Sequence, residues 1–180
     1  GTTTITYTVA GYMCPSTKIV TVNAPPTPIA GTPQLCQGTN ATYTDGTPGG
    51  TWSSGDPATA TINPATGVVT GVVTGVTVPI GLTITYTLGA GCIATKDITV
   101  NPAPAAITGP TTVCRGQAIT LFDPTPGGYW ASSAPATGSV NSTGDVTGIT
   151  PGAITVSYTN VYGCQATHPV TVNASPGPIL

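Results

Sequence analysis

Threonine alternates with isoleucine, valine and tyrosine along much of this chain, in segments such as ITYT, ATATI and DITVN. An alternation with a period of two predicts β-strands that bury one face. Turn-forming runs such as TPGG, SGDP and NPATG separate these segments. No segment shows the 3.6-residue period of an amphipathic helix, so the sequence predicts an all-β protein.

The alternating segments fall into two similar stretches of the chain. Many short strands separated by turns, with a tryptophan on one strand and two cysteines bracketing most of the stretch, predict an immunoglobulin-like β-sandwich. In the first stretch we expect strands near Ile29 and at 41–44, 51–53, 59–62, 68–70, 82–88 and 93–100. In the second we expect them near Ile107 and at 119–122, 129–132, 138–140, 146–147, 154–158 and 166–172. The side chains expected to pack around a disulfide in the core are Trp52, Ile62, Val69, Ile84, Tyr86 and Ile98.

The two stretches are copies of one repeat. Cys36 and Trp52 recur 78 residues later as Cys114 and Trp130, and a phrase ending in TVN occurs three times. Self-similarity of this size predicts a tandem array of modules. The predicted boundaries are the C-terminal strands of a preceding repeat at 1–23, complete repeats at 24–101 and 102–173, and the start of a following repeat at 174–180. We therefore expect the chain to be a piece of a longer array.

The five cysteines occupy two repeat positions. Cys36 and Cys114 share one position, and Cys14, Cys92 and Cys164 share the other. One cysteine of each kind per repeat predicts the bridges Cys36–Cys92 and Cys114–Cys164, with Cys14 pairing outside this stretch of chain. Persistent disulfides indicate an oxidising compartment, so we expect a secreted or cell-surface protein. A reactive thiol is the alternative, although the sequence has no CxxC motif.

Charge and chemistry point away from an enzyme. Only 4% of the residues are charged, and the formal net charge is −2. Three basic residues are too few to form the basic patch that nucleic-acid binding requires. The single histidine, His168, is replaced by Lys96 and Lys18 in the other copies, so we expect an exposed polar position. The aspartates are scattered one per loop, which leaves no carboxylate pair for glycoside hydrolysis. We expect no catalytic residue, no cofactor, no metal and no membrane insertion.

A few polar and aromatic residues have two interpretations. Asp45 and Asp123 precede the TPGG turns, where they accept hydrogen bonds from turn amides or, as the alternative, contribute to a calcium site. Trp52 and Trp130 are expected in the core rather than as sugar-stacking platforms. The better candidates for exposed aromatic contacts are Tyr12, Tyr129 and Tyr162.

The combined motif resembles a known family. The pattern W-S-S-x-x-P-A-x-A-x-(I/V)…T-G-x-V-T-G…I-T-Y-T…V-T-V is similar to the second group of bacterial immunoglobulin-like repeats. The added GC and (V/L)C(Q/R)G cysteines resemble the tandem versions in very large surface proteins of Bacteroidetes, including gliding-motility adhesins. The resemblance implies an extracellular, cell-envelope-associated role, in which such modules serve as stalks, spacers, adhesive tips and filament subunits.

These observations favour a structural role. The joints between repeats, VN-APPTPI and VN-PAPAAI, are short and rich in proline, which favours an extended, semi-rigid geometry. A nearly uncharged surface also permits lateral packing of modules into fibres. We expect a cell-surface stalk or filament whose partners are neighbouring repeats of the same chain. The alternative is an adhesin whose modules themselves bind glycan or a surface ligand.

Overall fold

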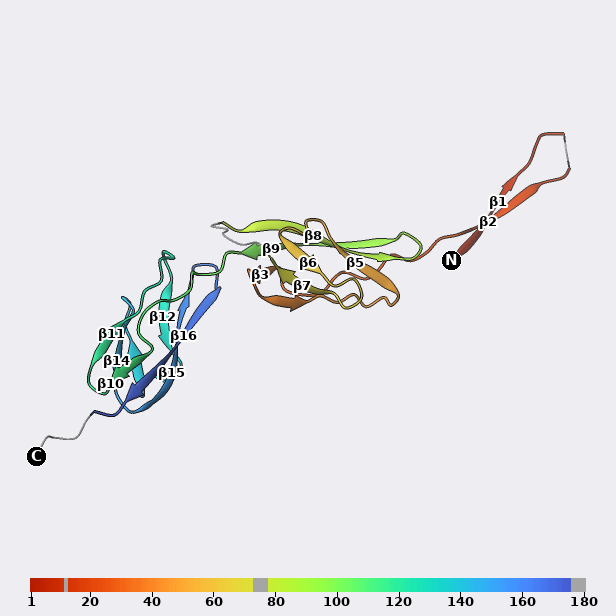
Figure 1. Ribbon diagram of the computed structural model, residues 1–180. Coiled ribbons are helices and arrows are strands. Elements are labelled where there is room, and N and C mark those ends of the chain that lie inside the picture. Colours follow the sequence, from red (N-terminus) through yellow and green to blue (C-terminus); the bar gives the residue numbers. More distant parts are fainter. Residues whose placement is uncertain (12, 73–77, 176–180) are drawn as a thin grey trace, which may run out of the picture. The chain divides into compact units, whose positions relative to one another are not determined.

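The computed structural model describes residues 1–11, 13–72 and 78–175, and every regular element in them is a β-strand (Figure 1). No helix in this part of the chain is long and apolar enough to cross a membrane. The strands are β1 (Thr2–Tyr7), β2 (Ser16–Thr21), β3 (Gln34–Cys36), β4 (Asn40–Thr42), β5 (Gly50–Ser54), β6 (Ala60–Ile62), β7 (Val68–Gly71), β8 (Ile80–Leu88), β9 (Ile93–Asn101), β10 (Thr112–Cys114), β11 (Ala118–Thr120), β12 (Tyr129–Ser132), β13 (Gly138–Val140), β14 (Asp145–Gly148), β15 (Gly152–Thr159) and β16 (Gln165–Asn173).

The chain divides into two compact units. The first holds Gly1–Leu35, Thr39–Val72 and Gly81–Thr99, in which β1 and β2 pair as a separate hairpin. The second holds Cys36–Gly38 together with residues 78–80 and 100–175. The ends of β3 and β9 therefore belong to the second unit, although the sequence assigns them to the first repeat.

Each complete repeat forms two sheets with the same strand order. In the first repeat these are β3-β9-β8-β5 and β4-β7-β6, and in the second they are β10-β16-β15-β12 and β11-β14-β13. β10 runs parallel to β16, whereas β15 and β16 form a long antiparallel hairpin. Two sheets that share one apolar core make the tandem immunoglobulin-like sandwich that the alternating pattern predicts.

The core of each sandwich is built around an aromatic pair. Trp52 packs against Tyr86 with ring centroids 4.7 Å apart, and Trp130 packs against Tyr158 at 5.0 Å. Trp52 is buried, whereas Trp130 is half-buried at the margin of its core. Of the other predicted core residues, Val69, Ile84 and Ile98 are buried and Ile62 is half-buried.

The predicted strands match the structure except at the start of each repeat. Near Ile29 and Ile107 the chain makes only isolated bridges, of which one joins Ala30 to Thr44. The first true strands are β3 and β10, each three residues long and each ending in a cysteine. These two strands were not predicted from the sequence, and they determine where the cysteines lie.

The predicted disulfides within each repeat are wrong. Cys36 is bonded to Cys164, with Cα atoms 5.7 Å apart and 128 residues between them in sequence. In the described part of the chain, Cys14, Cys92 and Cys114 are free thiols. Both bonded cysteines belong to the second unit, although the sequence pattern places Cys36 in the first copy of the repeat.

Strand direction explains the error. Cys114 lies opposite Asn173, the last residue of β16, whereas Cys164 directly precedes the first residue of that strand. Nine residues at about 3.3 Å each place the two cysteines on the order of 30 Å apart, and a disulfide needs Cα atoms within roughly 7 Å. A bridge within one repeat is therefore excluded by the length of its last strand.

Candidate functional site

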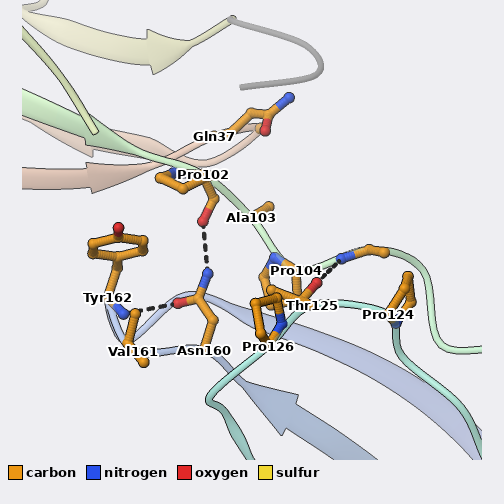
Figure 2. Close-up of a pocket in the computed structure, with 12 residues that line it drawn as sticks. Gln37, Pro102, Ala103, Pro104, Pro124, Thr125, Pro126, Asn160, Val161 and Tyr162 are labelled. Atoms are coloured by element: carbon orange, nitrogen blue, oxygen red, sulfur yellow. Dashed lines mark hydrogen bonds between the residues drawn. The ribbon is translucent and has the colours of Figure 1, made fainter. Parts of the chain in front are cut away.

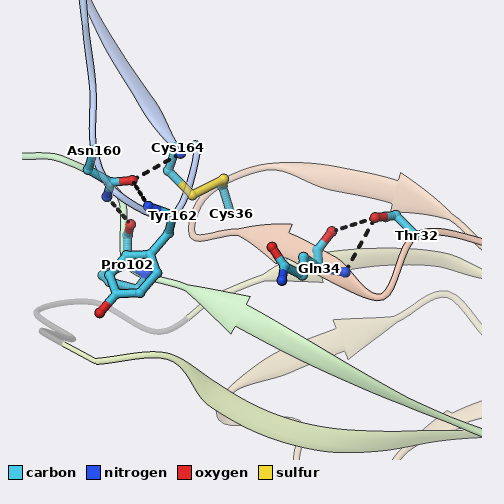
Figure 3. The surroundings of a disulfide bond; sticks show 7 residues. All are labelled: Thr32, Gln34, Cys36, Pro102, Asn160, Tyr162 and Cys164. Carbon is cyan, nitrogen blue, oxygen red and sulfur yellow. Dashed lines mark hydrogen bonds between the residues drawn. A yellow bond between two sulfur atoms is a disulfide. The ribbon is translucent and has the colours of Figure 1, made fainter. Parts of the chain in front are cut away.

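The disulfide lies beside a buried asparagine that ties together the chain segments around it (Figure 3). Asn160 is 4% exposed, and its Nδ2 donates to the backbone oxygen of Pro102 over 2.8 Å. Its Oδ1 accepts from the amides of Tyr162 and Cys164, both at 3.0 Å. One side chain thus links the turn that carries Cys164 to the segment that leads from the first repeat into the second.

That leading segment is held by further hydrogen bonds within the second unit. The amide of Gln37, next to Cys36, donates to the oxygen of Asn101 over 2.9 Å. The amide of Ala105 donates to Oγ1 of Thr125 over 2.9 Å. Asn101, Pro102 and Ala105 therefore have hydrogen-bond partners outside the segment, and proline restricts φ at residues 102 and 104.

A pocket of about 790 Å³ opens beside this segment, and all the residues that line it belong to the second unit (Figure 2). Its lining is dominated by proline and alanine from two loops. The hydroxyl of Thr125 and the amide of Asn160 are already engaged with the backbone of the leading segment. The pocket thus presents mainly apolar surface, with Val161 and Tyr162 as its large exposed side chains.

A tyrosine hydroxyl closes the TPGG turn in each repeat. Tyr86 donates to the oxygen of Thr47 over 2.6 Å and accepts from the amide of Gly50 over 2.8 Å. Tyr158 makes the equivalent bonds with Thr125 and Gly128. A Cβ atom added at Gly50 would lie 2.6 Å from Cε1 of Tyr86, so this glycine is required by the close approach of the ring.

The aspartates before the TPGG turns act as turn acceptors. Oδ1 of Asp45 accepts from the amide of Thr47 over 2.8 Å and from Oγ1 of Thr27 over 3.0 Å. Oδ1 of Asp123 accepts from the amide of Thr125 over 2.8 Å. Burial opposes ionisation of Asp45, but these hydrogen bonds outweigh it and hold its pKa below the ordinary value. Among the described residues, no group of three or more His, Cys, Asp or Glu side chains is placed to hold a metal ion.

The remaining candidates do not converge on one place. His168 lies on β16 opposite Val156 and is half-buried rather than exposed. Tyr162 lines the pocket, whereas Tyr129, 63% exposed, does not. Tyr12 lies outside the described residues. The residue that the sequence analysis missed is Asn160, and the available signal was that the first repeat has a leucine in its place.

No known protein family matches the sequence, and no curated protein matches it. Among solved structures, the chain is similar to domains 4 and 5 of the S-layer protein SbsC at 20% identity and a TM-score of 0.38, covering 84% of this chain and all of that one. A C-terminal fragment of intimin, in complex with the intimin-binding domain of its receptor, matches at 18% identity and a TM-score of 0.47 over 83% of this chain and 65% of that one. Cadherin domains 3–6 of protocadherin gamma B2 match at 13% identity and a TM-score of 0.39, over 91% and 55%.

The chain thus spans less than two thirds of the intimin and protocadherin structures that it matches. These structures contain immunoglobulin-like or cadherin-like β-sandwich domains. At such identities and TM-scores the similarity concerns the fold alone, and it carries no functional argument.

Proposed function

We propose that this chain is part of a structural extracellular array whose immunoglobulin-like repeats form a cell-surface stalk or filament. The observation that carries the proposal is the Cys36–Cys164 bond, which joins one sequence repeat covalently to the next. A bridge inside a module would stabilise that module alone. A bridge between residues of two sequence repeats instead holds those residues together under tension, which is a property that a stalk or filament requires.

The segment between the repeats supports the same role. Asn160 holds Pro102, and Thr125 holds Ala105, so the proline-rich joint has hydrogen-bond partners on the second repeat. A joint with fixed partners transmits force and direction better than a flexible linker does. The proposed partners of each repeat are therefore the neighbouring repeats of the same chain.

The exposed hairpin supports the proposed repeat boundaries. Ile5 and Tyr7 in β1 are 58% and 69% exposed, although their sequence equivalents Ile84 and Tyr86 are buried in β8. Strands that expose side chains of this kind need other strands to cover them. We infer that residues 1–23 are the last strands of a preceding repeat, that 24–101 and 102–173 are complete repeats, and that 174–180 begin another.

The location and source follow from the same proposal. A disulfide is stable in an oxidising compartment, which supports an extracellular or cell-surface position. The sequence resemblance to bacterial group-2 immunoglobulin-like repeats of large Bacteroidetes surface proteins supports a bacterial envelope as the setting. The proposed partners are neighbouring repeats and, for fibres, laterally packed copies of the array.

Electron microscopy of the full-length protein, with and without reductant, tests the structural role. We expect thin beaded fibres with one bead per repeat and a regular spacing. Compact particles without beads would contradict a stalk or filament.

The apolar pocket favours a second candidate, an adhesin whose modules bind a surface ligand. Glycan-array and cell-binding assays on this chain would detect such binding. Under this alternative, Tyr162→Ala, which alters the pocket, weakens binding at least tenfold, whereas Tyr129→Ala on the same repeat leaves it unchanged. Absence of binding by the unmodified chain would leave the structural role as the remaining candidate function.

A further inference from the structure

Two of the free cysteines, Cys92 and Cys114, occupy the same kinds of local structure as the two that are bonded. We call Cys36 and Cys114 the strand cysteines, because each ends the first strand of its sandwich, and Cys14, Cys92 and Cys164 the turn cysteines. The bond Cys36–Cys164 joins a strand cysteine to the turn cysteine of the next repeat. It therefore defines a pairing rule that the other cysteines can be tested against.

The turn cysteines of the two complete repeats have the same backbone environment. The amide of Leu88 donates to the oxygen of Cys92 over 2.9 Å, and the amide of Asn160 donates to the oxygen of Cys164 over the same distance. The glycine before each cysteine has a φ of 82°. Cys92 is thus presented by its hairpin as Cys164 is, and it is only partly buried, whereas the bonded Cys164 is 1% exposed.

The strand cysteines also match. The amide of the residue after Cys36 donates to the oxygen of Asn101 over 2.9 Å, and the amide of the residue after Cys114 donates to the oxygen of Asn173 over 2.8 Å. Both cysteines therefore lie beside the residue at which the chain leaves its repeat. Cys114 is exposed there as a free thiol.

We propose that Cys92 and Cys114 are disulfide sites for adjoining copies of the repeat, so that every strand cysteine bonds to the turn cysteine of the repeat that follows. Cys114 then bonds the turn cysteine of the next repeat, and Cys92 bonds the strand cysteine of the preceding one. This inference rests on the proposed array, because each site needs a neighbouring repeat. The bonded pair in this chain supplies the independent observation that these positions pair with each other.

Each new bond is a two-electron oxidation. The two thiols lose two protons and two electrons as the S–S bond forms. The disulfide of an oxidising thiol–disulfide oxidoreductase takes them up and becomes a dithiol, by exchange through a mixed disulfide. Enzymes of this chemical class act in the oxidising compartment where the array is proposed to lie.

The pairing rule gives the array an unusual covalent path. Cys92 and Cys114 are 22 residues apart, as are Cys14 and Cys36. The path runs from Cys14 along 22 residues to Cys36, the strand cysteine of the next repeat. It then crosses the disulfide to Cys164, the turn cysteine of the repeat after that. The path crosses two repeats in about 8 nm of extended chain. Tension follows this path, so residues 37–91 and 115–163 bear none of it.

A disulfide map of the full-length protein tests the pairing. With only three basic residues in this stretch, pepsin or thermolysin under non-reducing conditions is a better choice than trypsin. We expect linked peptides that join Cys114 to the next turn cysteine and Cys92 to the preceding strand cysteine. Peptides linking Cys36 to Cys92 or Cys114 to Cys164, or free thiols at Cys92 and Cys114, would overturn the proposal.

A matched pair of variants of the full-length protein adds a second measurement. Cys114→Ser is expected to expose one new thiol, located by alkylation in the repeat that follows, whereas Cys36→Ser exposes one at Cys164. Appearance of the new thiol at Cys164 in Cys114→Ser would contradict the rule. Beaded fibres with free thiols at Cys92 and Cys114 would reject this inference alone, whereas compact particles would reject the proposed stalk or filament.

Discussion

At the scale of single residues, each TPGG turn depends on a glycine that a tyrosine ring covers. Gly50→Ala places a Cβ atom 2.6 Å from Cε1 of Tyr86, which itself packs on Trp52. Overpacking of this kind costs about 1–3 kcal/mol, so we expect the free energy of unfolding to fall by that amount. Urea denaturation at constant m-value measures it.

The neighbouring glycine is the matched control. A Cβ atom at Gly49 would meet no atom within 4 Å, but its φ of 88° strains any other residue. Gly49→Ala is therefore expected to cost about 1 kcal/mol from backbone conformation alone. Equal losses in Gly49→Ala and Gly50→Ala would contradict the role assigned to the tyrosine ring.

Asp145 makes the stability of the second sandwich dependent on pH. The hydroxyl of Thr120 donates to its carboxylate over 2.7 Å, Asn141 and Thr143 donate as well, and these bonds lower the pKa of Asp145. A pKa that is lower in the folded state gives stabilisation above the unfolded pKa, near 3.9, and this stabilisation is lost as the pH falls through the folded pKa.

We therefore expect Asp145→Asn to be less stable than the unmodified chain at pH 7, with a difference that shrinks as the pH falls through the lowered pKa of Asp145. Thermal unfolding followed by circular dichroism from pH 2 to pH 7 measures the difference. A gap that stays constant across this range would show that the ionised carboxylate is not what stabilises the loop.

At the scale of elements, the sequence predicted strands well where polar and apolar residues alternate. The nine-residue strands β8 and β9 carry ITYT and DITVN, and their alternation matches their burial. β3 and β10 are three residues long, too short for a period to be recognised, and so they were missed. Without them the direction of the cysteine strand relative to β9 and β16 could not be derived, and the disulfide was assigned to the wrong partner.

The candidate site was harder to predict than the fold because it depends on contacts between distant segments. Asn160 reaches Pro102, 58 residues away, and no local pattern encodes that contact. Asn160→Leu, which introduces the residue of the first repeat, leaves the amide of Cys164 and the oxygen of Pro102 without their bonds. We expect a loss of about 1–3 kcal/mol in the free energy of unfolding.

Amide hydrogen exchange shows which part of the chain is destabilised in Asn160→Leu. In Asn160→Leu the amides of Tyr162 and Cys164 should exchange faster than in the unmodified chain. Val161→Ala, at a side chain that is 66% exposed, is the control and should change neither stability nor exchange. Unaltered exchange at Cys164 in Asn160→Leu would contradict the role of the asparagine.

At the scale of the whole molecule, one bond spans 128 residues and crosses from one repeat to the next. The chain-entropy model gives it at most about 5 kcal/mol when both repeats unfold. Cys164→Ser should therefore lower the denaturation midpoint, whereas Cys92→Ser, at the equivalent free thiol, should leave it unchanged. Added reductant should remove the difference between the two variants, and a persistent difference would contradict this assignment.

The most direct test is to stretch this chain between its two ends in urea, where only disulfides shorten it, and then to add reductant. The bond Cys36–Cys164 removes residues 37–163 from the stretched path. We predict a single lengthening of about 45 nm when it is reduced. Two separate lengthenings of about 20 nm and 18 nm, from loops 37–91 and 115–163, would show instead that each repeat closes its own bridge and would contradict the account.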